Sequence, residues 1–441
     1  MPTASARPSR MTAYTADLAA PTDTVTRTIG RVEDALDALH AALPEGYALS
    51  DRRLPRGPVR RARTLDETVT EVGDRFRAAD SGGGVLTVDD AALGPDLAVL
   101  YGAAARSRLA GDVLDSDPSP EEVVLWWASL SEADRTELLE ERHDDLGNLD
   151  GLPPAVRYDA NRRRITDEIE SSQAEVDDRS PWERFGDWVG DHNPGSESDT
   201  ERLAWLKDRL ATLEGLVEDG RQIWLFDPSG DGQVAEVLGD LEAADTVAVV
   251  VPGITNDIAN YRSLRGNAVN LQRRADEIDP GQTHATIAWL GYNTPNDIPA
   301  AASSGPADTG AEALVGDITE VDRINGSARH TIVAHSYGSV VAGHAMTDGI
   351  DVDAVAVVGS PGMGPNDRDD LGSPDVDLFA GRHQRDVVPY APAHGEDPSA
   401  DGFGATRFDT EVSGHSSYFE RGSVSLDNLA RIVIGQPVRP G

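Results

Sequence analysis

Residues 330–346 read HTIVAHSYGSVVAGHAM. An apolar, β-branched run leads to Ser336, and a helix-forming segment follows at once, which predicts a strand, a sharp turn and a helix. Ala334 and Gly338 stand two residues before and two after the serine, where a turn this sharp leaves room only for small side chains. We therefore predict a nucleophile elbow, with Ser336 clear of the sheet edge and the positive end of the next helix behind it.

The pentapeptide alone is a weak signal. Ser81 in ADSGG and Ser303 in AASSG fit the same loose pattern. Neither follows a predicted strand, so only Ser336 has the context of a strand-to-helix turn. The alternative interpretation of Ser336 is a turn with a purely structural role.

Buried strands are predicted on both sides of this stretch. Residues 246–253, TVAVVVPG, form a continuous β-branched run typical of a strand covered on both faces. Further strands are predicted at 284–291, 353–360, 376–386 and 404–411. One helix is predicted between strand 246–253 and Asp276, and another at 310–324. Residues 221–226 and 233–238 are predicted to form an antiparallel hairpin. The alternation predicts the α/β class, with an α/β-hydrolase fold and a mostly parallel, doubly wound sheet whose ligands lie at the carboxyl ends of the strands.

The first half of the chain has the periodicity of helices. Predicted helices cover 23–43, 66–79, 88–110, 119–143, 155–171 and 201–220, with Ser119 and Pro120 as a helix start. Residues 171–200 are polar and acidic with several helix breakers, so they are predicted to form a linker in which Trp182, Phe185 and Trp188 supply a small anchoring contact. We predict an all-helical N-terminal region at 1–220 and a catalytic domain at 221–441.

A serine hydroxyl needs a base and an orienting acid, which in this fold follow in the order Ser, Asp, His. Asp386 ends the predicted strand 376–386 and precedes a Val-Val-Pro turn that can present a carboxylate at the sheet edge. Competing carboxylates lie in the loop before that strand or inside it: Asp367, Asp375 and Asp377. We predict Asp386 as the acid.

The predicted base is His415. It follows the last strand in SGHSSYF, and Gly414 frees the backbone so that the ring can turn back towards Ser336. His383 and His394 are the alternatives, each of which is otherwise a surface or loop histidine. His415 alone comes after the last predicted strand.

An oxyanion hole needs two backbone N–H donors aimed at the developing charge. Tyr337, directly after the serine, is predicted to supply one of them. Ile254 is predicted to supply the other, because it follows Gly253 in the loop after strand 246–253, where glycine permits close backbone approach. Thr255 is the nearest competitor, and the alternative reading of Pro252-Gly253 is an ordinary turn.

Composition excludes several classes of function. The net charge is −38, which makes nucleic acid and anionic membranes poor partners. Lys207 is the only lysine, a bias explained by a GC-rich genome or by adaptation to a salty cytoplasm. There is no cysteine, so disulfides, thiolate metal sites and a cysteine nucleophile are excluded. No signal peptide or membrane-spanning run is evident, so we predict a cytoplasmic protein, with secretion without a cleaved signal left open.

Cofactor and metal motifs are missing as well. A phosphate-binding P-loop needs a lysine after its glycines, and no G-x-G-x-x-G or H-E-x-x-H occurs. DPSGDGQVAEVL, residues 227–238, resembles a calcium loop, but its twelfth position is Leu238 instead of glutamate, and a hairpin turn explains it more simply. We predict no cofactor and no metal.

The sequence resembles an actinobacterial, DUF1023-like family of α/β-hydrolases of undefined function that is sometimes found with a helical N-terminal region. The resemblance rests on VVVPGITN (249–256), IAWLGYNTP (287–295), IVAHSYGSVVAG (332–343), VVGSPGMG (357–364), the aspartate of RDVVPYAP and the histidine of SGHSSYF. It extends through 125–139 and 146–164 and covers roughly 120–435. Many members have glycine where this chain has Ala334, which is small enough to keep the turn.

These features together predict a serine esterase-like hydrolase acting on a small-molecule acyl substrate through an acyl-enzyme. Residues 291–310 are a candidate loop of the acyl pocket. The alternative is a catalytically idle hydrolase-like protein that binds a protein partner through its helical half. Transfer of the acyl group to an acceptor other than water is a third reading.

Overall fold

The computed structural model describes residues 113–114, 118–177, 197–218, 220–388, 393–411 and 413–441. The chain divides into two compact units, residues 1–132 and 133–441. The predicted helices at 23–43, 66–79 and 88–110 lie outside the described residues, as does Ser81. No helix in the described part of the chain is long and apolar enough to cross a membrane.

In the first unit, α6 (Pro120–Ser129) begins where the sequence predicts. The Ser119 hydroxyl accepts a hydrogen bond from the backbone N–H of Glu122, whose carboxylate accepts the N–H of Ser119. This reciprocal capping box satisfies two amides that have no partner inside the helix. The single helix predicted over 119–143 is wrong, because α6 ends at Ser129 and α7 (Glu132–Glu141) is separate.

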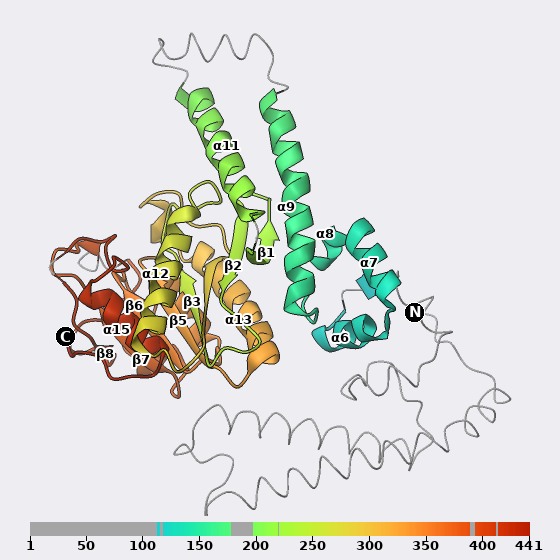
Figure 1. Cartoon of the computed structure of the whole chain (residues 1–441). Helices are drawn as coiled ribbons and strands as arrows, with labels where there is room; N and C mark the ends of the chain where they lie inside the picture. The colour runs from blue at the N-terminus through green and yellow to red at the C-terminus, as the bar shows by residue number, and fades with distance from the viewer. Residues whose placement is uncertain (1–112, 115–117, 178–196, 219, 389–392, 412) are drawn as a thin grey trace, which may run out of the picture. The chain divides into compact units, whose positions relative to one another are not determined.

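The helices that precede the sheet are α8 (His143–Leu146), α9 (Pro154–Asp177) and α11 (Glu197–Leu216). The linker predicted at 171–200 is helical at both ends, and its middle, 178–196, lies outside the described residues. Figure 1 shows α9 and α11 side by side. The buried Asn161 amide on α9 donates to the carbonyl oxygens of Ile223 and Trp224, so α9 is bonded to the edge of the sheet. These helices and the sheet belong to the same compact unit, residues 133–441. The domain boundary expected between residues 220 and 221 stays a prediction.

One eight-stranded sheet organises the second unit, in the order β1-β2-β4-β3-β5-β6-β7-β8. Its strands are β1 (Gln222–Asp227), β2 (Gln233–Leu238), β3 (Thr246–Val251), β4 (His284–Leu290), β5 (Arg329–His335), β6 (Ala354–Val358), β7 (Asp377–Gly381) and β8 (Thr406–Arg407). The pairings of β1 with β2 and of β2 with β4 are antiparallel, and the remaining pairings in the sheet are parallel. The predicted hairpin and the mostly parallel sheet are both confirmed.

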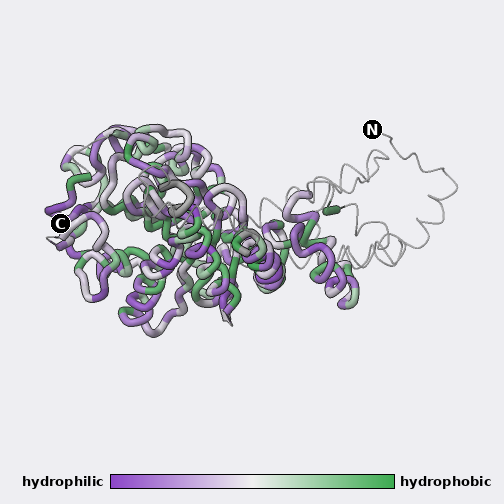
Figure 2. The backbone as a smooth tube through the Cα atoms, turned by 90° about the horizontal axis from the view of Figure 1, so that it is seen from above, coloured by the Kyte–Doolittle hydropathy of each residue, from purple (hydrophilic) through white to green (hydrophobic). Residues whose placement is uncertain are grey.

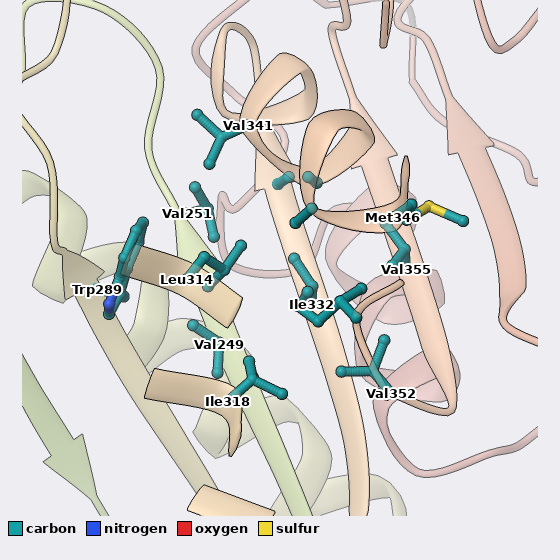
Figure 3. Packing of buried hydrophobic residues seen from close by; sticks show 14 of the residues in the cluster. Val249, Val251, Trp289, Leu314, Ile318, Ile332, Val341, Met346, Val352 and Val355 are labelled. Carbon is teal, nitrogen blue, oxygen red and sulfur yellow. The ribbon is translucent and has the colours of Figure 1, made fainter. Parts of the chain in front are cut away.

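Helices cover both faces of this sheet, each over its own hydrophobic cluster. Side chains alternate along β3, so that Val249 and Val251 pack towards α13 (Gly305–Asn325) and α14 (Gly338–Thr347), whereas Val250 faces the other side. Figure 3 shows the first cluster, with Leu314 and Ile318 beside the strands. α12 (Arg262–Ile278) covers the second cluster. Figure 2 shows hydrophobic segments in the interior of the unit and hydrophilic ones mostly outside.

Helix α15 (Val424–Val433) was not predicted from the sequence, and it packs beside α12 on the second face (Figure 1). Its signals are short but present: Ser423 caps it by accepting the N–H of Leu426, and Leu426, Leu429 and Val433 recur at helical spacing. Ten residues are too few for the pattern to stand out beside a chain end.

Parallel pairing brings the carboxyl ends of β3, β5, β6 and β7 to one edge. The loops that follow these strands begin at Pro252, Ser336, Gly359 and Arg382. Residues more than a hundred positions apart in sequence are therefore gathered at one place, as the fold class predicts.

Asp317 on α13 joins this helix to two strands. Its two carboxylate oxygens accept the indole N–H groups of Trp224 on β1, at 2.9 Å, and Trp289 on β4, at 2.7 Å. Asp317→Ala should lower the free energy of unfolding by roughly 2–4 kcal/mol, because two buried donors lose their partner. Urea denaturation measures this. Glu312→Ala removes an exposed carboxylate from the same helix and should change stability by less than about 0.5 kcal/mol. Equal losses in both variants would contradict the role of Asp317.

Candidate active site

Ser336 occupies the turn between β5 and α14 with a left-handed backbone conformation, φ 55°. Its N–H donates to the carbonyl of Val358 on β6 at 2.9 Å, which fixes the turn against the neighbouring strand. A Cβ atom on Gly338 would lie 2.6 Å from the carbonyl oxygen of Pro252, closer than packed atoms approach. Gly338 is therefore required by the turn, and the neighbouring backbone at Pro252 is what excludes a larger side chain.

His415 lies between Ser336 and Asp386. Its Nε2 is 2.8 Å from the Ser336 hydroxyl, and its Nδ1 is 2.9 and 3.0 Å from the two carboxylate oxygens of Asp386. A carboxylate only accepts, so Nδ1 carries the proton and Nε2 is left to accept the hydroxyl hydrogen of the serine. The structure thus brings the three predicted side chains into one hydrogen-bonded chain.

Asp386 is fully buried and has partners for both oxygens. Besides His415, it accepts the hydroxyl of Tyr418 at 2.6 Å and the backbone N–H of Val388 at 3.0 Å. Burial raises the pKa of Asp386, but the hydrogen bonds from His415, Tyr418 and Val388 lower it more, so this pKa lies below its usual value. The carboxylate is therefore ionised at neutral pH.

Gly359, at the end of β6, lets the His415–Asp386 pair lie directly against the backbone. It has φ 61°, and a Cβ atom there would lie 2.8 Å from Asp386 Oδ2 and 2.9 Å from His415 Cε1. No side chain fits that space. Gly359 belongs to the VVGSPGMG stretch of the family resemblance, but no role for it follows from the sequence.

His335 is a second histidine beside the site that the sequence analysis did not single out. Its Nε2–H donates to the carbonyl oxygen of His415 at 2.8 Å, and the two rings lie 4.7 Å apart. Burial, reinforced by the neighbouring His415, lowers the pKa of His335 to about 4. His335 is therefore neutral at pH 7 and holds the backbone of His415 without adding charge. It directly precedes the serine, but only the fold brings it to residue 415.

One predicted oxyanion donor, Tyr337, directly follows Ser336, and the other, Ile254, directly follows Gly253 in the loop beside the serine. Neither the N–H of Tyr337 nor that of Ile254 donates to any of the described residues. Thr255, the competitor, already donates its N–H to the carbonyl of Pro295 at 2.8 Å. A Cβ atom on Gly253 would lie 2.7 Å from Ser336 Cβ, so the loop approaches the serine as closely as glycine allows.

Side-chain hydrogen bonds fix this loop. The Asn256 amide donates to the carbonyl oxygens of Gly253 and Ile254, at 3.1 and 2.9 Å. The N–H of Asn256 in turn donates to the Thr294 hydroxyl at 3.0 Å. The loop that carries the Ile254 amide is therefore held in place by its own side chains.

The competing residues have other partners. His383 is buried, donates to the Gly414 carbonyl at 2.8 Å and stacks on the ring of Tyr418. His394 is 2.6 Å from the carbonyl of Ala301, and Asp367 caps a short turn through the N–H groups of residues 369 and 370. Asp375 and Asp377 are exposed before or at the start of β7, away from the strand's carboxyl end, and Ser303 accepts the N–H of Gly305.

The described residues contain no group of three or more histidine, aspartate or glutamate side chains placed to hold a metal ion. The stretch that resembles a calcium loop is the turn of the β1–β2 hairpin, where the Asp227 carboxylate accepts the N–H of Ser229 at 2.8 Å.

The sheet order, the crossover helices and the serine elbow at the end of the fifth strand define an α/β-hydrolase fold. Residues 227–395 match the family described as "Alpha/beta hydrolase", so this part of the chain is similar to that family. The matched stretch contains Ser336 and Asp386, and His415 lies beyond it.

The curated relatives are mycobacterial, which agrees with the predicted actinobacterial family. An uncharacterized protein of Mycobacterium tuberculosis H37Rv is 28% identical over 373 residues, which cover 71% of this chain and 55% of the relative. An uncharacterized protein of Mycobacterium bovis is 29% identical over 182 residues, 37% of this chain and 66% of the relative. The chain spans about half the length of the first of these relatives.

Two solved structures are similar over about half of the chain. A CIB-like hydrolase of Thermoplasma acidophilum has a TM-score of 0.31 at 17% identity, covering 49% of this chain and 97% of that one. An α/β serine hydrolase without a lid from Xanthomonas campestris has a TM-score of 0.31 at 15% identity, covering 50% and 98%.

The hydrogen bond from Tyr418 to Asp386 predicts a pH-dependent loss of stability. Tyr418→Phe should raise the pKa of Asp386, because one of the groups that lower it is removed. A depressed carboxyl pKa stabilises the fold above the unfolded value of about 3.9, and this contribution is lost as pH falls through the folded pKa. Tyr418→Phe should therefore cost roughly 1–3 kcal/mol at pH 6, and the cost should shrink below about pH 4.

The matched control is Tyr261→Phe. Tyr261 is equally buried, and its hydroxyl donates to the carbonyl of Ala288 at 2.8 Å, an acceptor that does not titrate. Its cost should be nearly independent of pH. Denaturant titrations of both variants from pH 3.5 to 7 make the comparison, and parallel pH profiles would contradict the coupling between Tyr418 and Asp386.

Proposed function

We propose that this chain is a serine hydrolase that cleaves an ester or a related acyl bond through an acyl-enzyme. The observation that carries the proposal is the continuous hydrogen-bonded chain from the Ser336 hydroxyl through His415 to the buried Asp386. A buried carboxylate, a histidine with its Nδ1 proton held and a serine in a strained turn are the parts that serine acyl transfer needs.

The reaction begins with attack of Ser336 Oγ on the carbonyl carbon of the substrate. His415 Nε2 takes the hydroxyl proton as the new C–O bond forms, and Asp386 stabilises the resulting imidazolium. His415 then returns the proton to the leaving alcohol, and the acyl group remains on Ser336. A water molecule, deprotonated by the same nitrogen, releases the acid and restores the serine.

The carbonyl oxygen becomes negatively charged in both tetrahedral intermediates. The amides of Tyr337 and Ile254 are the proposed donors, because Tyr337 follows Ser336, Ile254 follows Gly253 beside the serine, and neither N–H donates to a described residue. Because Asn256 holds the loop that carries Ile254, the site needs little reorganisation when charge develops.

A fluorophosphonate probe tests the proposal directly, because it phosphonylates an activated serine. The wild-type protein should be labelled, and Ser336→Ala should abolish labelling. Ser303→Ala is the matched control, since Ser303 also stands in a small-residue serine motif but accepts a hydrogen bond from Gly305, and labelling should persist. Asp386→Asn should lower kcat for an activated ester by about 10⁴-fold.

An unlabelled protein with a cooperative thermal transition would overturn the proposal. That result would favour the alternative of an idle hydrolase-like protein acting through its helical region. Product analysis with added alcohols or amines separates hydrolysis from acyl transfer once labelling is established.

The contact between Gly253 and Ser336 predicts a second kinetic effect. Gly253→Ala should lower kcat by roughly 100-fold, because the added methyl group pushes the Ile254 amide away from the developing oxyanion. Gly266→Ala, on α12, has open space around the new methyl group and should leave kcat unchanged. Steady-state hydrolysis of an activated ester measures both, and an unaltered kcat in Gly253→Ala would refute the assignment of this loop.

A further inference from the structure

A cavity of about 260 Å³ lies between the C-terminal half of α12 and the start of α15. The charged residues that line it are Arg273, Arg274, Arg421, Arg439, Glu277 and Asp427. Asp386 does not line the cavity, and neither do Ser336 and His415, so this is a place distinct from the proposed catalytic centre. Four guanidinium groups converge there in a chain whose net charge is −38.

The carboxylates of the cavity are already shared among several arginines. Asp427 pairs directly with Arg274, lies 3.0 Å from Arg431 and lies 3.6 Å from Arg439. Glu277 lies 3.3 Å from Arg273 and 3.0 Å from Arg274. The lining groups carry four positive charges against two negative ones, an excess of two.

Arg421 contributes most clearly to this excess. Its Nε donates to the Asn270 amide oxygen at 2.8 Å, and no described carboxylate forms an ion pair with it. Asn270 in turn donates to the carbonyl of Phe419 at 3.0 Å, so the side chain that orients Arg421 is itself fixed. The two terminal nitrogens of the Arg421 guanidinium have no hydrogen-bond partner among the described residues.

The amides at the start of α15 are already occupied. Glu411 accepts the N–H groups of Val424 and Ser425, and Ser423 accepts that of Leu426. The arginine side chains must therefore provide the binding. Pairing of α12 with α15 accounts for Arg274 and Arg431 through Asp427. It does not account for Arg421, which has no acidic partner in the described part of the chain, or for Arg439, which is 59% exposed at 3.6 Å from Asp427.

We propose that this cavity binds a phosphate dianion, either inorganic phosphate or the phosphate group of a small monoester. Guanidinium groups present paired N–H donors that match two oxygens of a phosphate, and the excess of two positive charges equals the charge of the dianion. Against the strongly negative whole chain, a bound anion requires this local concentration of arginine. The proposal does not depend on the proposed hydrolase activity.

Isothermal titration of the full chain with inorganic phosphate, and separately with glycerol 3-phosphate, tests the site. Sodium chloride keeps the ionic strength constant, because screening alone changes the stability of so acidic a protein. We expect saturable binding at a 1:1 ratio, weakened at least 10-fold in the Arg421→Gln/Arg439→Gln double variant. Tighter binding of one of the two probes identifies the free ion or the monoester as the source.

The control variant is Arg262→Gln. Arg262 is exposed at the other end of α12, about 18 Å along the helix from Arg274. This variant removes one positive charge outside the cavity and should bind phosphate like the wild type. Thermal melts establish that the variants are folded.

Three outcomes would overturn the proposal. They are no saturable binding of either probe to the wild type, equal weakening in Arg262→Gln and in the double variant, and binding of the dicarboxylate succinate as tight as that of phosphate. Equal weakening would show that phosphate binds through non-specific charge attraction, and equally tight binding of succinate would show that the cavity takes a different class of ligand.

Discussion

The site depends on one close approach of two backbone segments. The loop after β3 lies so near the turn after β5 that Cβ atoms on Gly338 and Gly253 would lie 2.6–2.7 Å from Pro252 and Ser336. Ser336 has φ 55° at this approach, and an added Cβ atom on Gly253, the residue before Ile254, would lie 3.1 Å from the serine hydroxyl. Strain of this kind persists only where the surroundings over-determine it, and parallel pairing of β3 with β5, together with the bond from Ser336 to Val358, supplies the constraint.

A second layer of contacts holds the other two members of the chain of hydrogen bonds. Tyr418 and Val388 fix Asp386, His335 holds the carbonyl of His415, and Gly359 lets the pair lie against β6. These contacts are backbone or neutral groups, so Asp386 keeps its negative charge for the histidine. One short segment before α15 carries His415, Tyr418 and Arg421. The residue that lines the arginine cavity, Arg421, therefore follows the histidine by only a few positions.

Much of this arrangement could be predicted from residue patterns. Buried β-branched runs located β3, β5 and β6 nearly to the residue, and the elbow motif with its flanking small residues located Ser336. The order of residues pointed to Asp386 and His415. Short or polar elements were harder: α15 has ten residues, and the predicted linker proved helical at both of its described ends, where the polar sequence does not mark a break.

The sequence by itself determined the class of fold and the identity of the three side chains, because both depend on local periodicity, small residues at a turn and order along the chain. Only the tertiary structure decided which groups support them. Tyr418 and His335 carry no local signal of their roles, since each acts through a partner 32 or 80 positions away that packing alone brings near. The cavity between α12 and α15 also could not be found from the sequence. Its arginines are scattered from 273 to 439, and their charges come together only where the two helices meet.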